Sequence, residues 1–135
     1  MPAKVGKIEL YMGPTEVGGP DDLRAAIVKF IGGAEKYLDI AVQELDSREI
    51  ADAILDARKR NVRVRLVMEG DYLRAGKRFS RPWDPGGGHE INREIQNAIL
   101  RSAVNVRSDY NGAIFHQKFI VRDRKALMTG STNFT

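Results

Sequence analysis

Hydrophobic positions along the chain follow two different spacings. Apolar residues occupy every second position within 37–42 and within 62–68, which predicts two strands. Between these segments, apolar residues recur at helical spacing from Ile50 to Ala57, so a helix is expected there. Strand, helix and strand in that order, with short links, indicate a right-handed crossover between parallel neighbours of one sheet. The sequence therefore predicts an α/β fold with a mixed, mainly parallel β-sheet flanked by helices.

Further elements extend this unit on both sides. Alternation within Lys7–Met12 predicts a short strand, and helical spacing predicts a helix over 23–31. Another helix is expected after residue 90, followed by a short strand near 104–106. The apolar face expected of that later helix consists of Ile91, Ile95, Ala98 and Ile99. All these elements fit in a single domain over residues 1–135, because a chain of this length is large enough for one core and too small for two.

Start signals accompany two of the predicted helices. Asp21 or Asp22 is expected to cap the helix over 23–31, because an aspartate side chain accepts a bond from a free backbone amide. Asp46, with Glu49 three residues later, has the spacing of a capping box at the start of the next helix.

The segment 69–90 has no clear period and contains two prolines and the triplet Gly86–Gly88. This composition predicts a long, partly mobile, basic and glycine-rich surface loop within the domain. The triplet lacks the following lysine of a P-loop, so we interpret it as a source of flexibility. Tyr72 and Trp83 are expected to pack this loop down, with stacking on nucleic-acid bases as the alternative.

Positive charge is concentrated in one part of the sequence. The formal net charge is +4, whereas residues 58–81 hold nine basic and two acidic residues and are net +7. Such a concentration favours a polyphosphate partner or an anionic membrane surface, because it raises encounter rates and releases counterions. A solvated helix end and loop is the alternative interpretation.

Composition excludes several other classes. A content of 42% hydrophobic and 30% charged residues is typical of soluble globular proteins. The chain has no cysteine, which excludes disulfides and thiolate metal sites, and its two histidines lie far apart in sequence. We therefore expect no metal and no cofactor. No apolar run approaches the roughly 20 residues that cross a bilayer, and no signal core is present, so a cytoplasmic location is expected.

The last part of the chain carries the candidate chemistry. Residues 114–121 and 126–129 are apolar runs separated by a polar turn, which predicts an antiparallel hairpin. On a strand, His116 and Lys118 would face the same way about 7 Å apart. After the second strand, a bend at Gly130 can bring a hydroxyl and a carboxamide beside that pair.

These residues form a compound pattern with fixed spacing. It reads His116-x-Lys118, four residues, Asp123, six residues, Gly130-Ser131-x-Asn133. This pattern resembles the HKD motif of the phospholipase D superfamily, and it is far more specific than a single triplet. Segments 40–42, 49–54 and 61–64 also look like that family, so the resemblance covers nearly the whole chain. The ending at 133–135 is more similar to the nuclease-like branch than to the lipid-synthase branch.

The resemblance implies a phospholipase D-like fold and a metal-independent phosphodiesterase. A neutral imidazole is a competent nucleophile near pH 7, so His116 would attack phosphorus and form a covalent phosphohistidine. Lys118 and the Asn133 amide would hold the non-bridging oxygens and stabilise the charge that grows in the transition state.

Three further residues of the motif are expected to support this chemistry. Ser131 would add a donor, and Gly130 allows the bend before it. Asp123 is expected to be structural, by pairing with Arg122 or Arg124 or by bonding turn amides.

The chain holds one copy of the motif, whereas the family uses two. In the family a second histidine protonates the leaving oxygen and then activates water. We expect it from a homodimer partner or from a second repeat, with the domain incomplete after the Gly-Ser-x-Asn segment. His89, the other histidine of the chain, is interpreted as a flexible loop residue, with the role of second acid as the alternative.

Three functions fit this resemblance. The first is cleavage of nucleic acid, for which Arg74, Lys77, Arg78 and Arg81 are the expected substrate-binding residues. The second is a phospholipase or phosphatidyltransferase acting on phospholipids, because fold and motif do not fix the groups around the phosphate. The third is a non-catalytic module that binds phosphate or DNA.

Overall fold

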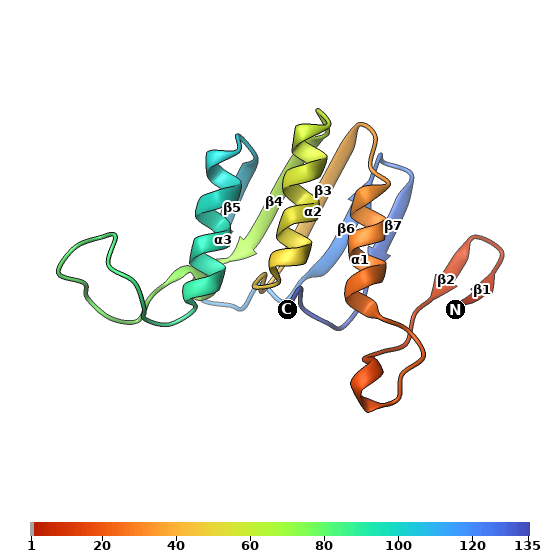
Figure 1. Ribbon diagram of the computed structural model, residues 1–135, viewed down its shortest axis with the longest axis horizontal. Coiled ribbons are helices and arrows are strands. Elements are labelled where there is room, and N and C mark those ends of the chain that lie inside the picture. Colours follow the sequence, from red (N-terminus) through yellow and green to blue (C-terminus); the bar gives the residue numbers. More distant parts are fainter. Residues whose placement is uncertain (1) are drawn as a thin grey trace.

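A five-stranded mixed sheet forms the centre of the molecule (Figure 1). The computed structural model describes residues 2–135. The elements are β1 (Ala3–Val5), β2 (Ile8–Leu10), η1 (Thr15–Val17), α1 (Leu23–Gly32), β3 (Tyr37–Val42), α2 (Arg48–Lys59), β4 (Arg63–Glu69), η2 (Gly70–Leu73), α3 (Glu90–Arg101), β5 (Asn105–Asp109), β6 (Lys118–Arg122) and β7 (Ala126–Thr129). The strand order is β5-β4-β3-β6-β7. Strand β6 runs antiparallel to its two neighbours, and the other two pairs are parallel, so the predicted α/β class with a mixed sheet is confirmed.

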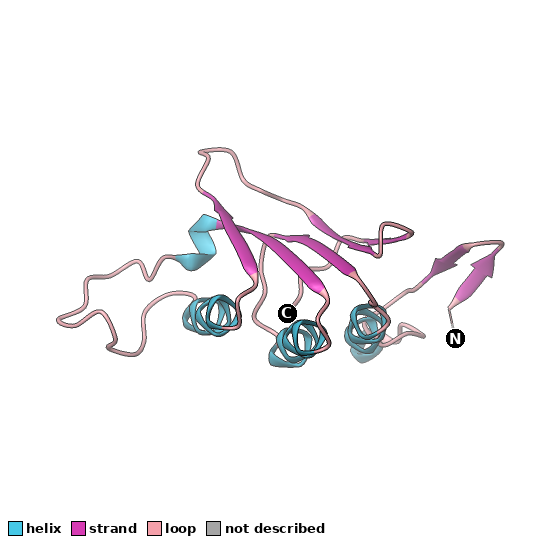
Figure 2. Cartoon of the chain, turned by 90° about the horizontal axis from the view of Figure 1, so that it is seen from above, coloured by secondary structure: helices cyan, strands magenta, loops and turns pink. Residues whose placement is uncertain are grey.

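Helices α1, α2 and α3 all lie on one face of this sheet (Figure 2). Alternate residues of the central strands point into this layer, and Leu38, Val42 and Leu66 have no exposed surface. This burial explains the period-2 pattern, because every second side chain of a strand faces the same side. The crossover from β3 through α2 to β4 joins parallel neighbours, as the sequence predicted.

The predicted cap of α1 is confirmed, whereas the predicted cap of α2 is not. The Asp22 carboxylate accepts a bond from Ala25 N at 2.9 Å, as expected of the cap of α1. The capping box predicted at Asp46 is wrong, because Ser47 caps α2 and accepts from Ile50 N at 3.5 Å. The amides of Asp46 and Ser47 both donate to the Phe134 carbonyl, so the chain enters the helix one residue later.

Helix α3 faces the core with a different set of residues from the predicted one. Ile91 is 44% exposed and Ala98 is exposed, whereas Asn92, Ile95 and Ile99 are buried. The Asn92 side-chain oxygen accepts a bond from Leu45 N at 3.0 Å. A buried amide is tolerated when it is hydrogen-bonded, and here it ties α3 to the segment that follows β3.

Two segments lie outside the main sheet, on its two sides in Figure 1. Strands β1 and β2 form an antiparallel hairpin outside the main sheet, and Val5, Ile8 and Leu10 are exposed. On the other side, η2 and an irregular segment lead from β4 to α3 and project beyond the sheet (Figure 1). None of the helices within residues 2–135 is both long and apolar enough to cross a membrane.

Candidate functional site

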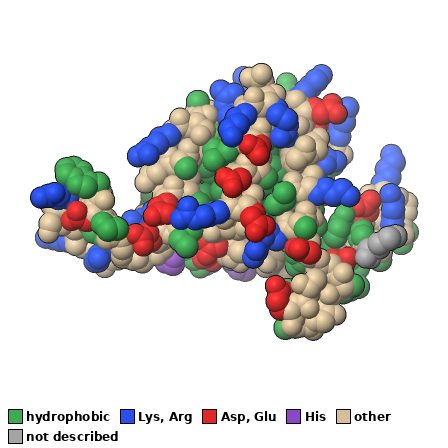
Figure 3. Space-filling view, viewed as in Figure 1, with side chains coloured by type: hydrophobic (Ala, Val, Ile, Leu, Met, Phe, Trp, Pro, Cys, Tyr) green, Lys and Arg blue, Asp and Glu red, His purple; other side chains and the backbone are tan. Residues whose placement is uncertain are grey.

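Most of the candidate residues gather at one edge of the sheet. Strands β3, β4, β5 and β7 end at this edge, and the antiparallel strand β6 begins there, at the lower side of Figure 1. Lys118 is the first residue of β6, and Gly130 follows the last residue of β7. Histidine side chains also appear along this lower edge in the space-filling view (Figure 3). Ends of parallel strands are a common location for active sites in α/β folds.

His116 lies before β6 rather than within it. The predicted strand over 114–121 is wrong for its first four residues, because β6 begins at Lys118. The amide of Phe115 donates to the Glu69 carboxylate at 2.5 Å and takes no part in the pairing of β6 with β3. The expected alternation along one strand therefore does not describe this pair: His116 is exposed, while Lys118 is only 7% exposed.

The Lys118 ammonium is nevertheless fixed beside the backbone of His116. Its Nζ donates to the His116 carbonyl at 3.2 Å and to Gln43 Oε1 at 3.0 Å. Both acceptors are neutral, and within residues 2–135 Lys118 forms no ion pair. A buried cation whose partners carry no negative charge is suited to receive an anionic group.

Gln43 connects this lysine to the segment that follows β4. Its Nε2 donates to the Tyr72 hydroxyl at 3.1 Å, and its backbone amide donates to the Gln117 carbonyl at 3.0 Å. Gln43 is itself buried. The ring of Tyr72 lies 4.7 Å from that of His89, so this histidine packs on Tyr72.

Asn133 is held at the same edge through its neighbour. Phe134 is buried, its amide donates to the Glu44 carbonyl at 3.1 Å, and it bridges to Leu45. Among the described residues, Asn133 Oδ1 is the buried side-chain atom without a hydrogen-bond partner. Such an atom requires a partner, which a bound water or ligand can supply.

Gly130 and Ser131 lie between Lys118 and Asn133. The Gly130 amide donates to the Lys118 carbonyl at 3.4 Å, and the Thr129 hydroxyl donates to the same carbonyl at 3.1 Å. Ser131 is exposed. The segment 130–134 is thus bonded to the Lys118 carbonyl at its start and to the Glu44 carbonyl, after β3, at its end.

Asp123 lies at the opposite edge of the sheet. Its carboxylate accepts bonds from three backbone amides, those of Glu35, Lys36 and Tyr37, at 2.7 to 3.2 Å. The bonds from Tyr37 and Lys36 lower the pKa of this carboxyl group below its usual value. These contacts are structural, and they reach the start of β3 rather than the amides of its own turn.

The four basic residues expected to bind substrate are exposed. Arg74 Nη1 lies 3.7 Å from the Asp71 carboxylate, and its guanidinium lies over the ring of Tyr110. Lys77 Nζ lies 4.8 Å from the centre of the Phe79 ring. The projecting part of this loop carries basic and hydrophobic side chains at the left of Figure 3, away from the middle of the sheet edge. The predicted packing of Trp83 is wrong, because its side chain is 75% exposed.

Gln43 and Glu69 lie at the candidate site but were not foreseen from the sequence, whereas Tyr72 was expected only to pack the loop down or to stack on bases. The first two are polar residues at the ends of buried strands, which is the one signal that could have indicated them. No group of three or more His, Cys, Asp or Glu side chains in residues 2–135 is arranged to hold a metal ion.

Comparison with known proteins identifies a family that matches most of this chain. The family of the cardiolipin synthase PLD-like domain matches residues 27–135. The mitochondrial cardiolipin hydrolase of Xenopus laevis is 36% identical over 104 residues, which are 76% of this chain and 41% of that protein. The phospholipase D of Rickettsia felis is 30% identical over 115 residues, which are 82% of this chain and 50% of that protein. The chain therefore spans half of the length of these relatives or less.

Among solved structures with a similar fold are two bacterial proteins. Nuc, a phospholipase D family member from Salmonella typhimurium, matches with a TM-score of 0.65 at 27% identity, over 83% of this chain and 64% of that chain. NucT from Helicobacter pylori matches with a TM-score of 0.57 at 20% identity, over 84% of this chain and 68% of that chain. The second likeness is one of fold alone.

Proposed function

The chain belongs to the phospholipase D superfamily, and from that premise we propose that its sheet edge is one half of a phosphodiesterase active site. The observation that carries the proposal is the buried Lys118 ammonium, which bonds neutral oxygens and lies against the backbone of His116. An ammonium in this state attracts a phosphate group to the residue that would attack it.

His116 is the nucleophile in this proposal. Its exposed imidazole attacks phosphorus, a nitrogen–phosphorus bond forms, and the bond to the leaving oxygen breaks. Lys118 and the Asn133 amide group stabilise the negative charge on the non-bridging oxygens. Water then hydrolyses the phosphohistidine, which returns the histidine and releases the second product.

A second histidine is needed to protonate the leaving oxygen and to activate the water. We propose that it comes from a second copy of the motif, in a homodimer partner or in a further repeat. Two copies of one motif that meet about a twofold axis would each supply a nucleophile and an acid. His89 is poorly suited to this role, because its ring packs on Tyr72.

For the substrate, we propose nucleic acid first. The exposed basic residues of the 74–81 segment can contact successive phosphates, and the ending at 133–135 resembles the nuclease-like branch of the family. The rival is a phospholipid, and the relatives named cardiolipin hydrolase and phospholipase D support it. The exposed Trp83 among basic residues also suits an anionic membrane surface. The cytoplasmic location remains a prediction from the sequence.

The decisive experiment offers both substrates to the protein in EDTA. A labelled single-stranded oligonucleotide and cardiolipin vesicles are incubated separately with the wild type, with His116→Asn and with His89→Asn. We expect oligonucleotide cleavage that falls by roughly a thousandfold or more in His116→Asn and persists in His89→Asn.

Each of the other outcomes would indicate a different function for the chain. Cleavage of cardiolipin alone would replace the nuclease proposal by the phospholipid one. Binding of the oligonucleotide without cleavage, unchanged in His116→Asn, would indicate a non-catalytic phosphate-binding module. Loss of activity in His89→Asn would make that histidine the second acid.

A further inference from the structure

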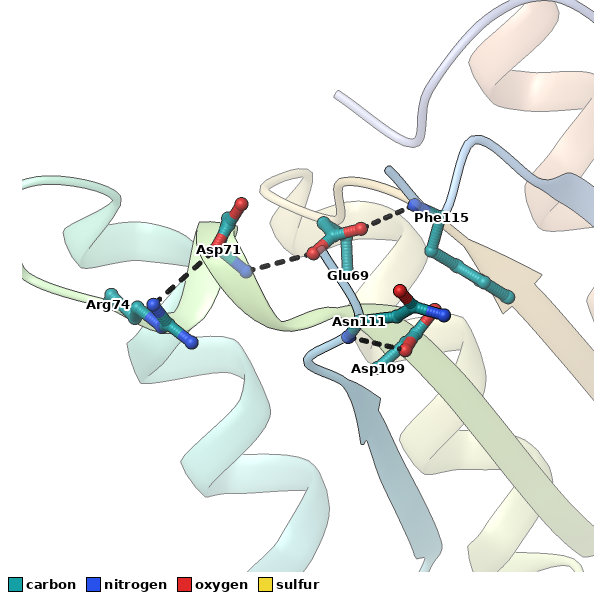
Figure 4. Close-up of polar contacts among 6 residues, drawn as sticks. All are labelled: Glu69, Asp71, Arg74, Asp109, Asn111 and Phe115. Carbon is teal, nitrogen blue, oxygen red and sulfur yellow. Dashed lines mark hydrogen bonds and ion pairs between the residues drawn. The ribbon is translucent and has the colours of Figure 1, made fainter. Parts of the chain in front are cut away.

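Glu69 is a fully buried carboxylate that no step of the proposed reaction uses. It is the last residue of β4 and is 1% exposed. One carboxylate oxygen accepts from the Asp71 amide at 3.2 Å, and the other accepts from the Phe115 amide at 2.5 Å. Figure 4 shows this carboxylate between the start of η2 and the segment that carries Phe115.

We propose that Glu69 is a positioning residue for His116, an inference that rests on the proposed function of that histidine. The dipeptide Phe115-His116 is held at both of its ends. The amide of the preceding residue is held by Glu69, and the carbonyl of His116 is held by Lys118 Nζ. The backbone of the nucleophile is therefore clamped between a buried anion and a buried cation.

These two bonds matter because the segment has few other ties to the sheet, such as the bond from Gln43 N to the Gln117 carbonyl. Residues 110–117 form no helix or strand, and most of their side chains are exposed. The bond from Phe115 N joins residues 46 positions apart in sequence, so it ties this segment to the end of β4. Without it, His116 would be held on the Lys118 side alone, and a misplacement of the imidazole by about 1 Å costs on the order of 100-fold in rate.

The same carboxylate also orders the start of the basic loop. Its second bond, to Asp71 N, begins η2, from which Tyr72 reaches Gln43 and Arg74 reaches Tyr110. In the neighbouring strand, Asp109 pairs with Glu69 in register and accepts from the Asn111 amide at 2.9 Å (Figure 4). Two acidic side chains at the strand ends thus shape the backbone that leads to the nucleophile.

The test replaces Glu69 with methionine, which has a similar length and accepts no such bonds. Asp39→Leu is the control, because Asp39 is a carboxylate of the adjacent strand β3 that contacts the Arg65 side chain, at 2.6 and 2.9 Å, and is remote from the candidate site. Amide hydrogen exchange of Phe115 is measured in the wild type and in both variants. We expect exchange about fivefold to tenfold faster in Glu69→Met and unchanged in Asp39→Leu.

Activity is measured in parallel on whichever substrate the wild type cleaves. In Glu69→Met we expect kcat to fall by roughly 100-fold and KM to change much less than kcat, because Lys118 and Asn133 remain while only the start of the basic loop loses a bond. Glu69→Gln keeps one acceptor oxygen and should lie between the wild type and Glu69→Met. It also serves as the test if Glu69→Met does not fold.

Two results would overturn the inference. One is exchange of the Phe115 amide at the wild-type rate in Glu69→Met, or in Glu69→Gln if the methionine variant does not fold. The other is an equal loss of kcat in Asp39→Leu and Glu69→Met, which would show a general effect on the fold. If the wild type cleaves neither substrate, a homodimer of this chain does not supply the second histidine, and the exchange rates alone decide whether Glu69 fixes the segment.

Discussion

Asp123 shows how a residue of a catalytic motif can act on the backbone instead. It lies in the turn between β6 and β7 with a φ of 53°, and Arg124 follows with a φ of 57°. Aspartate tolerates this left-handed region better than most side chains, because its short carboxylate can bond locally. Here the carboxylate reaches the amides of residues 35–37 and joins the turn to the start of β3.

The contacts of Asp123 predict a pH-dependent contribution to stability. Its pKa in the folded protein lies below the ordinary value of 3.8, chiefly because the Tyr37 and Lys36 amides bond the charged form. The contribution is therefore fully present above about pH 4 and is lost as the pH falls through the lower folded pKa. Asp123→Asn should lower Tm at neutral pH and should show a shallower fall of Tm in acid, as measured by circular dichroism. Asp56→Asn, at an exposed helix pair with Lys59, is the control and should change little.

The start of helix α2 depends on a contact with Phe134, a residue far away in the sequence. The Phe134 carbonyl accepts from the amides of both Asp46 and Ser47, so the end of the chain helps to set where α2 begins. The same contact places Asn133 beside the end of β3. The start of the helix and the position of a candidate catalytic amide therefore depend on one another.

Two neighbouring substitutions separate the real cap of α2 from the predicted one. Ser47→Ala removes the side-chain acceptor for Ile50 N and should lower the free energy of unfolding by about 0.5–1 kcal/mol. Asp46→Ala is the matched control and should cost less, because its side chain caps nothing. Urea unfolding followed by circular dichroism measures both values. A larger loss in Asp46→Ala would restore the capping box that the sequence indicated.

The sequence predicted most elements because their signals are local. Strands β3 and β4 are buried on their helix side, so their alternating apolar residues are visible in the sequence. The start of β6 was not predictable, because Phe115 N bonds a carboxylate 46 residues away, at the end of β4, and not a strand neighbour. The same holds for the burial of Asn92, whose partner Leu45 lies 47 residues away.

At the candidate site, too, residues with a local sequence signal were predicted and residues held by distant partners were not. His116, Lys118 and Asn133 are found by their motif, since their spacing along the chain is fixed. Gln43 and Glu69 were missed because their bonds to Lys118 and Phe115 span 75 and 46 residues. A sequence pattern identifies the groups that react, whereas the groups that hold them depend on how the strands meet.

On the scale of the whole molecule, the basic segment of the sequence is split into two parts. Arg58 and Arg63 lie where β4 begins, and the loop with Arg74 and Arg81 follows the end of that strand. A seven-residue strand spans about 20 Å, so the two groups lie at opposite edges of the sheet. Only the second group is on the side of His116, and it alone can extend a phosphate-binding surface from the candidate active site.

This separation predicts that equal losses of charge have unequal effects on nucleic-acid binding. Arg78→Gln with Arg81→Gln should weaken binding of a single-stranded oligonucleotide and should reduce the slope of log K against log salt by about 0.7 for each phosphate that is no longer neutralised. The matched control, Arg58→Gln with Arg63→Gln, removes the same charge at the opposite edge and should leave that slope nearly unchanged. Fluorescence anisotropy over a range of salt concentrations measures both. If the two double variants weaken binding equally, net charge rather than the loop governs the encounter, and the loop has no specific role in holding the substrate.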